Sequence, residues 1–88
     1  MNIFSSIIIN NERRLATGTN LYDIVVQGRS LTAVLEREAG MLHKSVIEFQ
    51  VEFDNGKSMP FMAYFSPDED WVRLDDIVPC TEAGHLYL

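Results

Sequence analysis

The sequence is poor in several residue types on which whole classes of protein depend. One cysteine, Cys80, occurs among 88 residues, so the chain cannot form an internal disulfide, and a cysteine-based metal site would need other ligands. A small domain without disulfides is typical of a reducing compartment, and we expect a cytoplasmic protein. Lys and Arg number seven against thirteen Asp and Glu. Because phosphate contacts need clustered basic side chains, direct nucleic-acid binding is not expected.

Long apolar runs and targeting signals are also missing. The opening MNIFSSIIIN has no basic residue, and Ser5-Ser6 interrupts its apolar run, so it predicts a strand and not a secretory signal. No stretch approaches the ~18 apolar residues of a membrane span, and no membrane contact is expected. A chain of 88 residues is too short for a second core, which predicts one compact domain over residues 1–88.

Catalytic motifs are absent as well. The sequence has no glycine-rich phosphate loop, nucleophile elbow or HExxH pattern. Cys80 and His85 have a spacing that a thiol and its base can use, but no third group is evident to position them. His43 follows a predicted helix end, where a cation is favourable without any catalytic role. We therefore predict neither an enzyme nor a bound cofactor.

The clearest local signal in the chain is a β-hairpin. In VIEFQVEF, residues 46–53, apolar side chains alternate with Glu and Gln, which predicts a strand with one buried face. Asn55-Gly56 tolerates positive φ and predicts the turn, with a return strand over 59–65. Pro60 lacks an N–H, which favours either an edge position for that strand or outward pairing at this residue.

The segment between Leu21 and Gly40 permits two interpretations in its first half. Residues 21–27 suit either the start of a long helix or a short strand. The second half predicts a helix over 31–39, with Ser30 as its N-cap and Gly40 as its stop.

These elements predict an α+β fold. A small antiparallel sheet would consist of the hairpin 46–53/59–65 and the N-terminal strand, packed against one or two short helices. The last eight residues, TEAGHLYL, suggest a turn and a short final strand.

The most unusual stretch is SPDEDWVRLDD, residues 66–76, with five carboxylates around the only tryptophan. Ser66, Pro67 and Glu69 match the cap, N1 and N3 positions of a capping box, which predicts a helix beginning here. A turn followed by a strand over WVRL is the alternative. Trp71 recurs with Leu74 and Ile77 at helical spacing, which favours a core position for the indole ring.

Helix capping explains only part of this acidic stretch. Asp68, Glu69 and Asp70 suit the positive end of a helix, but Asp75 and Asp76 would oppose the dipole at its other end. An EF-hand is excluded because Val72 and Arg73 stand where a third ligand and a glycine are needed, so no metal site is predicted.

The charge is unevenly distributed, which suggests a role for these acids. Residues 1–44 carry a net +1 and residues 45–88 a net −7. An acidic surface speeds the encounter with a basic protein. It can also imitate a phosphate backbone and occupy the groove of a nucleic-acid-binding protein. The predicted partner-binding residues are Asp68, Glu69, Asp70, Trp71, Asp75, Asp76, Glu48 and Glu52.

We therefore predict a non-catalytic protein-protein interaction module that acts as an inhibitor of a basic or nucleic-acid-binding partner, of the kind that mobile elements carry. Two alternatives stay open. A structural subunit that assembles with itself, as a homodimer for example, would bury Met62, Tyr64 and Trp71 between copies. A small-ligand-binding domain would hold its ligand between helix and sheet, and the acids would then be incidental.

Overall fold

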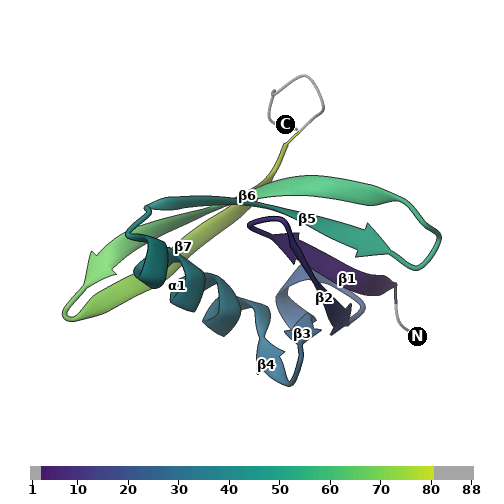
Figure 1. Ribbon diagram of the computed structural model, residues 1–88, viewed down its shortest axis with the longest axis horizontal. Helices are drawn as coiled ribbons and strands as arrows, with labels where there is room; N and C mark the ends of the chain where they lie inside the picture. The colour runs from purple at the N-terminus through teal and green to yellow at the C-terminus, as the bar shows by residue number, and fades with distance from the viewer. Residues whose placement is uncertain (1–2, 81–88) are drawn as a thin grey trace.

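The computed structural model describes residues 3–80 and shows one antiparallel sheet with a single α-helix packed on one face (Figure 1). The elements, in chain order, are β1 (Phe4–Ile9), β2 (Glu12–Thr17), the 3₁₀ helix η1 (Leu21–Asp23), β3 (Val25–Val26), β4 (Arg29–Ser30), α1 (Leu31–Leu42), β5 (Val46–Phe53), β6 (Ser58–Asp68) and β7 (Trp71–Pro79). The seven strands lie in the order β4-β3-β2-β1-β5-β6-β7, so β4 and β7 form the two edges. No helix within residues 3–80 is long and apolar enough to cross a membrane.

The core lies between α1 and the face of the sheet that it covers. On β5, the predicted alternation holds: Ile47, Phe49 and Val51 are buried, and Glu48 and Gln50 are exposed on the opposite face. The rings of Phe49 and Phe61, which are paired across β5 and β6, lie 5.6 Å apart. We call the face away from α1 the outer face.

Turn chemistry fixes two of the connections. Asn10 and Asn11 join β1 to β2 with φ of 54° and 64°, the left-handed pair that a two-residue hairpin turn requires and that Asn tolerates. The predicted hairpin at Asn55-Gly56 is confirmed, with Gly56 at φ 89° and its N–H donating to the Phe53 carbonyl.

Helix α1 begins where it was predicted and ends later. The Ser30 hydroxyl accepts a hydrogen bond from the Ala33 N–H at 3.2 Å, as an N-cap does. Gly40 does not stop the helix, which continues to Leu42 and ends at His43 in the left-handed region with φ 54°. Residues 21–27 form no part of a long helix, because η1 and β3 occupy them.

The helix predicted to begin at Ser66 is wrong, and the alternative of a turn and a strand is correct. Residues 58–79 form a hairpin in which Asp68 pairs with Trp71 across a turn at Glu69-Asp70. The misleading spacing of Leu74 and Ile77 comes from a β-bulge. Phe65 pairs with Leu74 and Tyr64 with Asp76, so Asp75 is an extra residue and the inward positions fall three apart.

The sheet is also larger than the small sheet that the sequence predicted. The hairpin and the N-terminal strand are present, but β2, β3, β4 and β7 extend the sheet on both sides. Pro60 lies on β6, which is an interior strand and not an edge. The final strand expected over TEAGHLYL lies outside the described residues.

Replacing the N-cap tests the start of α1. We expect Ser30→Ala to lower the free energy of unfolding by about 1 kcal/mol and Ser30→Gly by only a few tenths, because glycine suits an N-cap better than alanine. Urea denaturation measures both values. Ser58→Ala, on an exposed serine of β6, is the control, and an equal loss for Ser30→Ala and Ser58→Ala would contradict the capping role.

Candidate functional site

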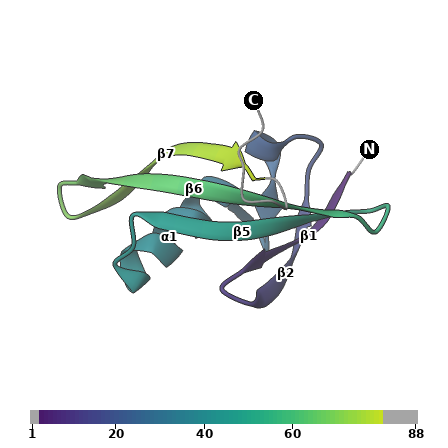
Figure 2. The ribbon, with the colours of Figure 1, turned by 90° about the horizontal axis from the view of Figure 1, so that it is seen from above.

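The acidic stretch forms the turn of the β6–β7 hairpin, and this turn extends past the end of α1. Figures 1 and 2 show the turn at one extremity of the molecule, away from both ends of the described chain. We call Asp68, Glu69, Asp70 and Trp71 the hairpin tip. All four are exposed. The tip therefore presents three carboxylates and an indole on a projecting element.

The carboxylates of the hairpin tip are not neutralised locally. Asp68, Glu69 and Asp70 make no ion pair with any side chain among residues 3–80. Arg73, the one basic residue between positions 66 and 76, pairs with Asp75 at 3.1 Å. The tip therefore keeps its negative charge, which a cationic group from elsewhere can balance.

Trp71 lies between the hairpin and the C-terminal end of α1. Its side chain is 51% exposed, so the predicted core position is wrong. The six-membered part of the indole ring rests on Gly40, where an added methyl carbon would lie 2.5 Å from Cε2 and 2.9 Å from Cη2. Gly40 is thus required for the approach of the indole ring and not for ending the helix.

A shallow hollow, which we call the tip hollow, opens beside this contact. Its volume is about 270 Å³, and its lining comes from both elements: Gly40, His43, Glu69, Asp70, Trp71 and Val72. Aromatic and carboxylate groups together favour a cation, because the ring face and the acids both attract positive charge. The C-terminal end of α1, the negative end of its dipole, adds to this potential.

Asp75 and Asp76 have different surroundings from the tip. Asp75 accepts hydrogen bonds from the Ser66 hydroxyl and from Arg73, and these two donors hold the pKa of Asp75 below its ordinary value of 3.8. Asp76 is exposed and accepts a hydrogen bond from the Ile77 N–H at 2.9 Å. Asp75 therefore belongs to the local structure of the hairpin, and Asp76 is available to a partner.

Glu48 lies on the outer face of the sheet, two strands from β7. It pairs with Met62 on β6, which pairs with Val78 on β7. Along these strands, the pair Tyr64–Asp76 lies two residues further on, on the same face. Glu48 and Asp76 thus share a face and flank the side chains of β6. Glu48 extends the acidic surface over the sheet but does not belong to the hairpin tip.

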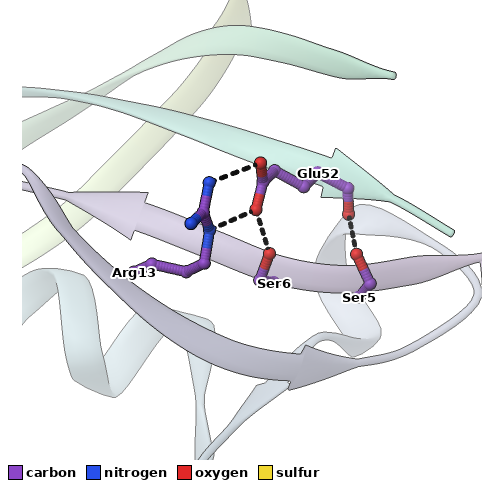
Figure 3. A network of polar contacts seen from close by, with 4 residues as sticks. All are labelled: Ser5, Ser6, Arg13 and Glu52. Atoms are coloured by element: carbon purple, nitrogen blue, oxygen red, sulfur yellow. Dashed lines mark hydrogen bonds and ion pairs between the residues drawn. The ribbon is translucent and has the colours of Figure 1, made fainter. Parts of the chain in front are cut away.

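Glu52 belongs to a different part of the molecule. Its carboxylate accepts two hydrogen bonds from the Arg13 guanidinium, at 2.7 and 2.9 Å, and one from the Ser6 hydroxyl (Figure 3). These contacts, that with Arg13 above all, hold the pKa of Glu52 below its ordinary value of 4.5. Glu52 therefore joins β5 to β1 and β2.

Distance along the sheet also separates Glu52 from the tip. Glu52 pairs with Ser58, ten residues from Asp68 on the same strand, which is ~33 Å at the rise of a β-strand. The structure thus brings together Asp68, Glu69, Asp70 and Trp71, with Asp75, Asp76 and Glu48 nearby, and leaves Glu52 at the far end of the sheet. Gly40 and His43 also line the tip hollow. The sequence analysis did not predict these two residues there, because no local pattern links α1 to residues 69–72.

No three His, Cys, Asp or Glu side chains between positions 3 and 80 gather in a way that could hold a metal ion. Cys80 is buried, and His85, its candidate base, lies outside the described residues.

Comparison of the chain with protein-family models, with curated proteins and with solved structures finds no match.

Adding a methyl group at Gly40 tests the contact with Trp71. We expect Gly40→Ala to push the indole ring off α1, so that Trp71 emission moves to longer wavelength while far-UV circular dichroism is unchanged. Thr32→Ala, an exposed change on the same helix, should leave the emission as it was. Unaltered emission in Gly40→Ala would mean that the ring does not rest on this residue.

Acid should weaken the contribution of Glu52 to stability. Because its pKa is lower in the folded chain than the ordinary 4.5, its contribution is complete above that value and is lost as pH falls through the lower folded pKa. We expect wild type to be more stable than Glu52→Gln at pH 7, with a difference that shrinks below pH ~4.5. Glu48→Gln removes a carboxylate from the same strand and face and serves as the control. A difference between wild type and Glu52→Gln that stays constant to pH 3 would argue against the network.

Proposed function

We propose that this protein is a non-catalytic, cytoplasmic protein-binding module whose hairpin tip docks on a basic protein. The observation that carries the proposal is the tip itself, in which three carboxylates without ion-pair partners in residues 3–80 surround a half-exposed tryptophan. Tryptophan is enriched among the residues that dominate binding energy at protein interfaces. Unpaired acids beside it supply attraction and selectivity for positive charge.

The position of the acids supports a binding role and not a stabilising one. Glu69 and Asp70 line a hollow with His43, the C-cap of α1. Carboxylates at the negative end of a helix dipole are unfavourable by a few tenths of a kcal/mol each. Helix capping, which favours carboxylates, does not apply because these residues lie in a β-turn. Neither helix stability nor local pairing accounts for these carboxylates, which supports a role in binding a cationic partner.

On this proposal, the partner is held at the tip hollow. Its volume of about 270 Å³ and its Trp71 wall suit the end of one lysine or arginine side chain, held by the ring face and the two carboxylates. Asp76 and Glu48 extend the negative surface for further basic residues around that anchor.

A protein that binds nucleic acid is the partner class that this surface fits best, because such proteins present clustered Lys and Arg. Carboxylates in a row can take the place of phosphates in a basic groove. On this proposal the module inhibits its partner by covering that groove, and it does not bind nucleic acid itself.

One observation favours self-assembly as a second candidate. Val46, Met62, Tyr64 and Val78 form a half-buried apolar group across β5, β6 and β7 on the outer face. A homodimer through this face would bury the group. Sedimentation equilibrium of wild type and Tyr64→Glu decides this case, since a dimer through this face would dissociate in the variant.

Charge reversal at the tip tests the main proposal. We expect the double variant Asp68→Lys with Asp70→Lys to bind a basic protein partner at least about tenfold more weakly than wild type at low salt. Affinity capture from the native host's lysate, with elution by rising salt, identifies the partner and compares the variants.

Asp54→Lys is the matched control for this experiment. Asp54 is an exposed carboxylate at the β5–β6 turn, which lies at the opposite end of β6. A partner captured equally by wild type, the tip double variant and Asp54→Lys would exclude the hairpin tip as the binding surface.

A further inference from the structure

A second charged hollow lies between the β3–β4 hairpin and the side of α1 and has the opposite sign. Its volume is about 280 Å³, and it is lined by Arg14, Val26, Gln27, Arg29, Val34 and Arg37. The three arginines come from β2, β4 and α1. Three of the seven basic residues of an acidic chain therefore meet at one place, with no acidic residue in the lining. We call this feature the arginine hollow.

The charge of the arginine hollow is only partly balanced. Arg14 pairs with Glu12 at 2.9 Å and with Glu38 at 3.3 Å. Arg29 and Arg37 are exposed and make no ion pair with the rest of the described chain, residues 3–80. Arg14 is thus a guanidinium held in place by two glutamates, and Arg29 and Arg37 supply net positive charge.

The position of Arg29 is unfavourable for the helix. Arg29 directly precedes Ser30, the N-cap of α1, so its positive charge lies at the positive end of the helix dipole. An anion bound by Arg29 would neutralise this unfavourable charge. The positive charge of Arg29, like the negative charge of the hairpin tip, has the sign that destabilises the helix. It is also the sign that binding of an oppositely charged ligand would require.

The fold holds Arg29 in a defined position. It follows the tight turn Gln27-Gly28, whose φ angles of 52° and 84° are those of a two-residue hairpin turn between β3 and β4. Val26, which pairs with Arg29, is 1% exposed and belongs to the core. The backbone that carries Arg29 is therefore anchored on a buried residue, and the Gln27 amide shares the lining.

We propose that the arginine hollow binds the phosphate group of a small anionic ligand. Guanidinium groups present paired N–H donors that match phosphate oxygens, and groups from three elements can surround one phosphate. The hollow is slightly smaller than the usual range for drug-sized ligands, which favours a compact anion. This site is independent of the hairpin tip and of the proposed partner binding.

Calorimetric titration of the full chain with inorganic pyrophosphate tests the site. We expect saturable binding to wild type that Arg37→Gln and Arg29→Gln each weaken at least about tenfold, the loss typical of one hydrogen bond to a charged group. Both arginines are exposed, so the variants should fold, and circular dichroism checks this.

A parallel titration with ATP tells whether the phosphate is recognised alone or as part of a nucleotide. Tighter binding of ATP with the same dependence on the two arginines indicates the nucleotide.

Lys57→Gln is the matched control, because it removes one positive charge from an exposed position in the β5–β6 turn. Binding that Lys57→Gln leaves intact and the arginine variants lose supports the site. The proposal is overturned if pyrophosphate does not bind to wild type. It is also overturned if all three variants weaken binding equally, because that result would indicate only a general attraction of the anion to positive charge.

Discussion

The two-residue alternation of β5 is the constraint on which the rest of the structure depends. Ile47, Phe49 and Val51 are 5%, 1% and 0% exposed, and they form the floor on which α1 packs. A shift of one residue in the pairing of β5 would move all three to the outer face. The position of α1 follows from this floor. The hairpin tip lies at the C-terminal end of α1, and the arginine hollow lies along its side, with Arg29 next to the N-cap.

The sequence predicted the elements whose signals are local. The β5 strand, the Asn55-Gly56 turn and the Ser30 cap each depend on residues close together in the chain, and each is present. The helix predicted to begin at Ser66 and to end at Pro79 is wrong, because a bulge at Asp75 gives a strand the three-residue spacing of a helix. The capping-box residues SPDE occur here at the end of β6 and in its turn, which shows that pairing between β6 and β7 outweighs a local preference for helix.

Contacts between distant segments could not be predicted in the same way. Glu52 was grouped with the acidic surface by its residue type, but its partner Arg13 lies 39 positions away along the chain. The same holds for Gly40 with Trp71 and for the three arginines of the second hollow, which β2, β4 and α1 bring together. The residues of the hairpin tip lie together because they are neighbours in sequence.

Charge in this molecule is divided along α1. The helix has twelve residues, ~18 Å at 1.5 Å per residue, with acids beyond its negative end and an arginine at its positive end. Both arrangements oppose the helix dipole, so neither is explained by the stability of the helix. Two hollows of opposite charge on one small domain suggest two ligands of opposite charge, one a basic side chain and the other a phosphate.

The most direct measurement is a solution NMR titration of the protein with a short arginine-rich peptide at low and at high salt. We predict that the largest shift changes fall on the Trp71 indole N–H and on the amides of residues 40–43 and 68–72, and that they disappear at about 1 M salt, where charge interactions are screened within ~3 Å. Changes centred on the outer face around Met62 and Tyr64, or no saturable change at all, would contradict the assignment of the hairpin tip as a binding site.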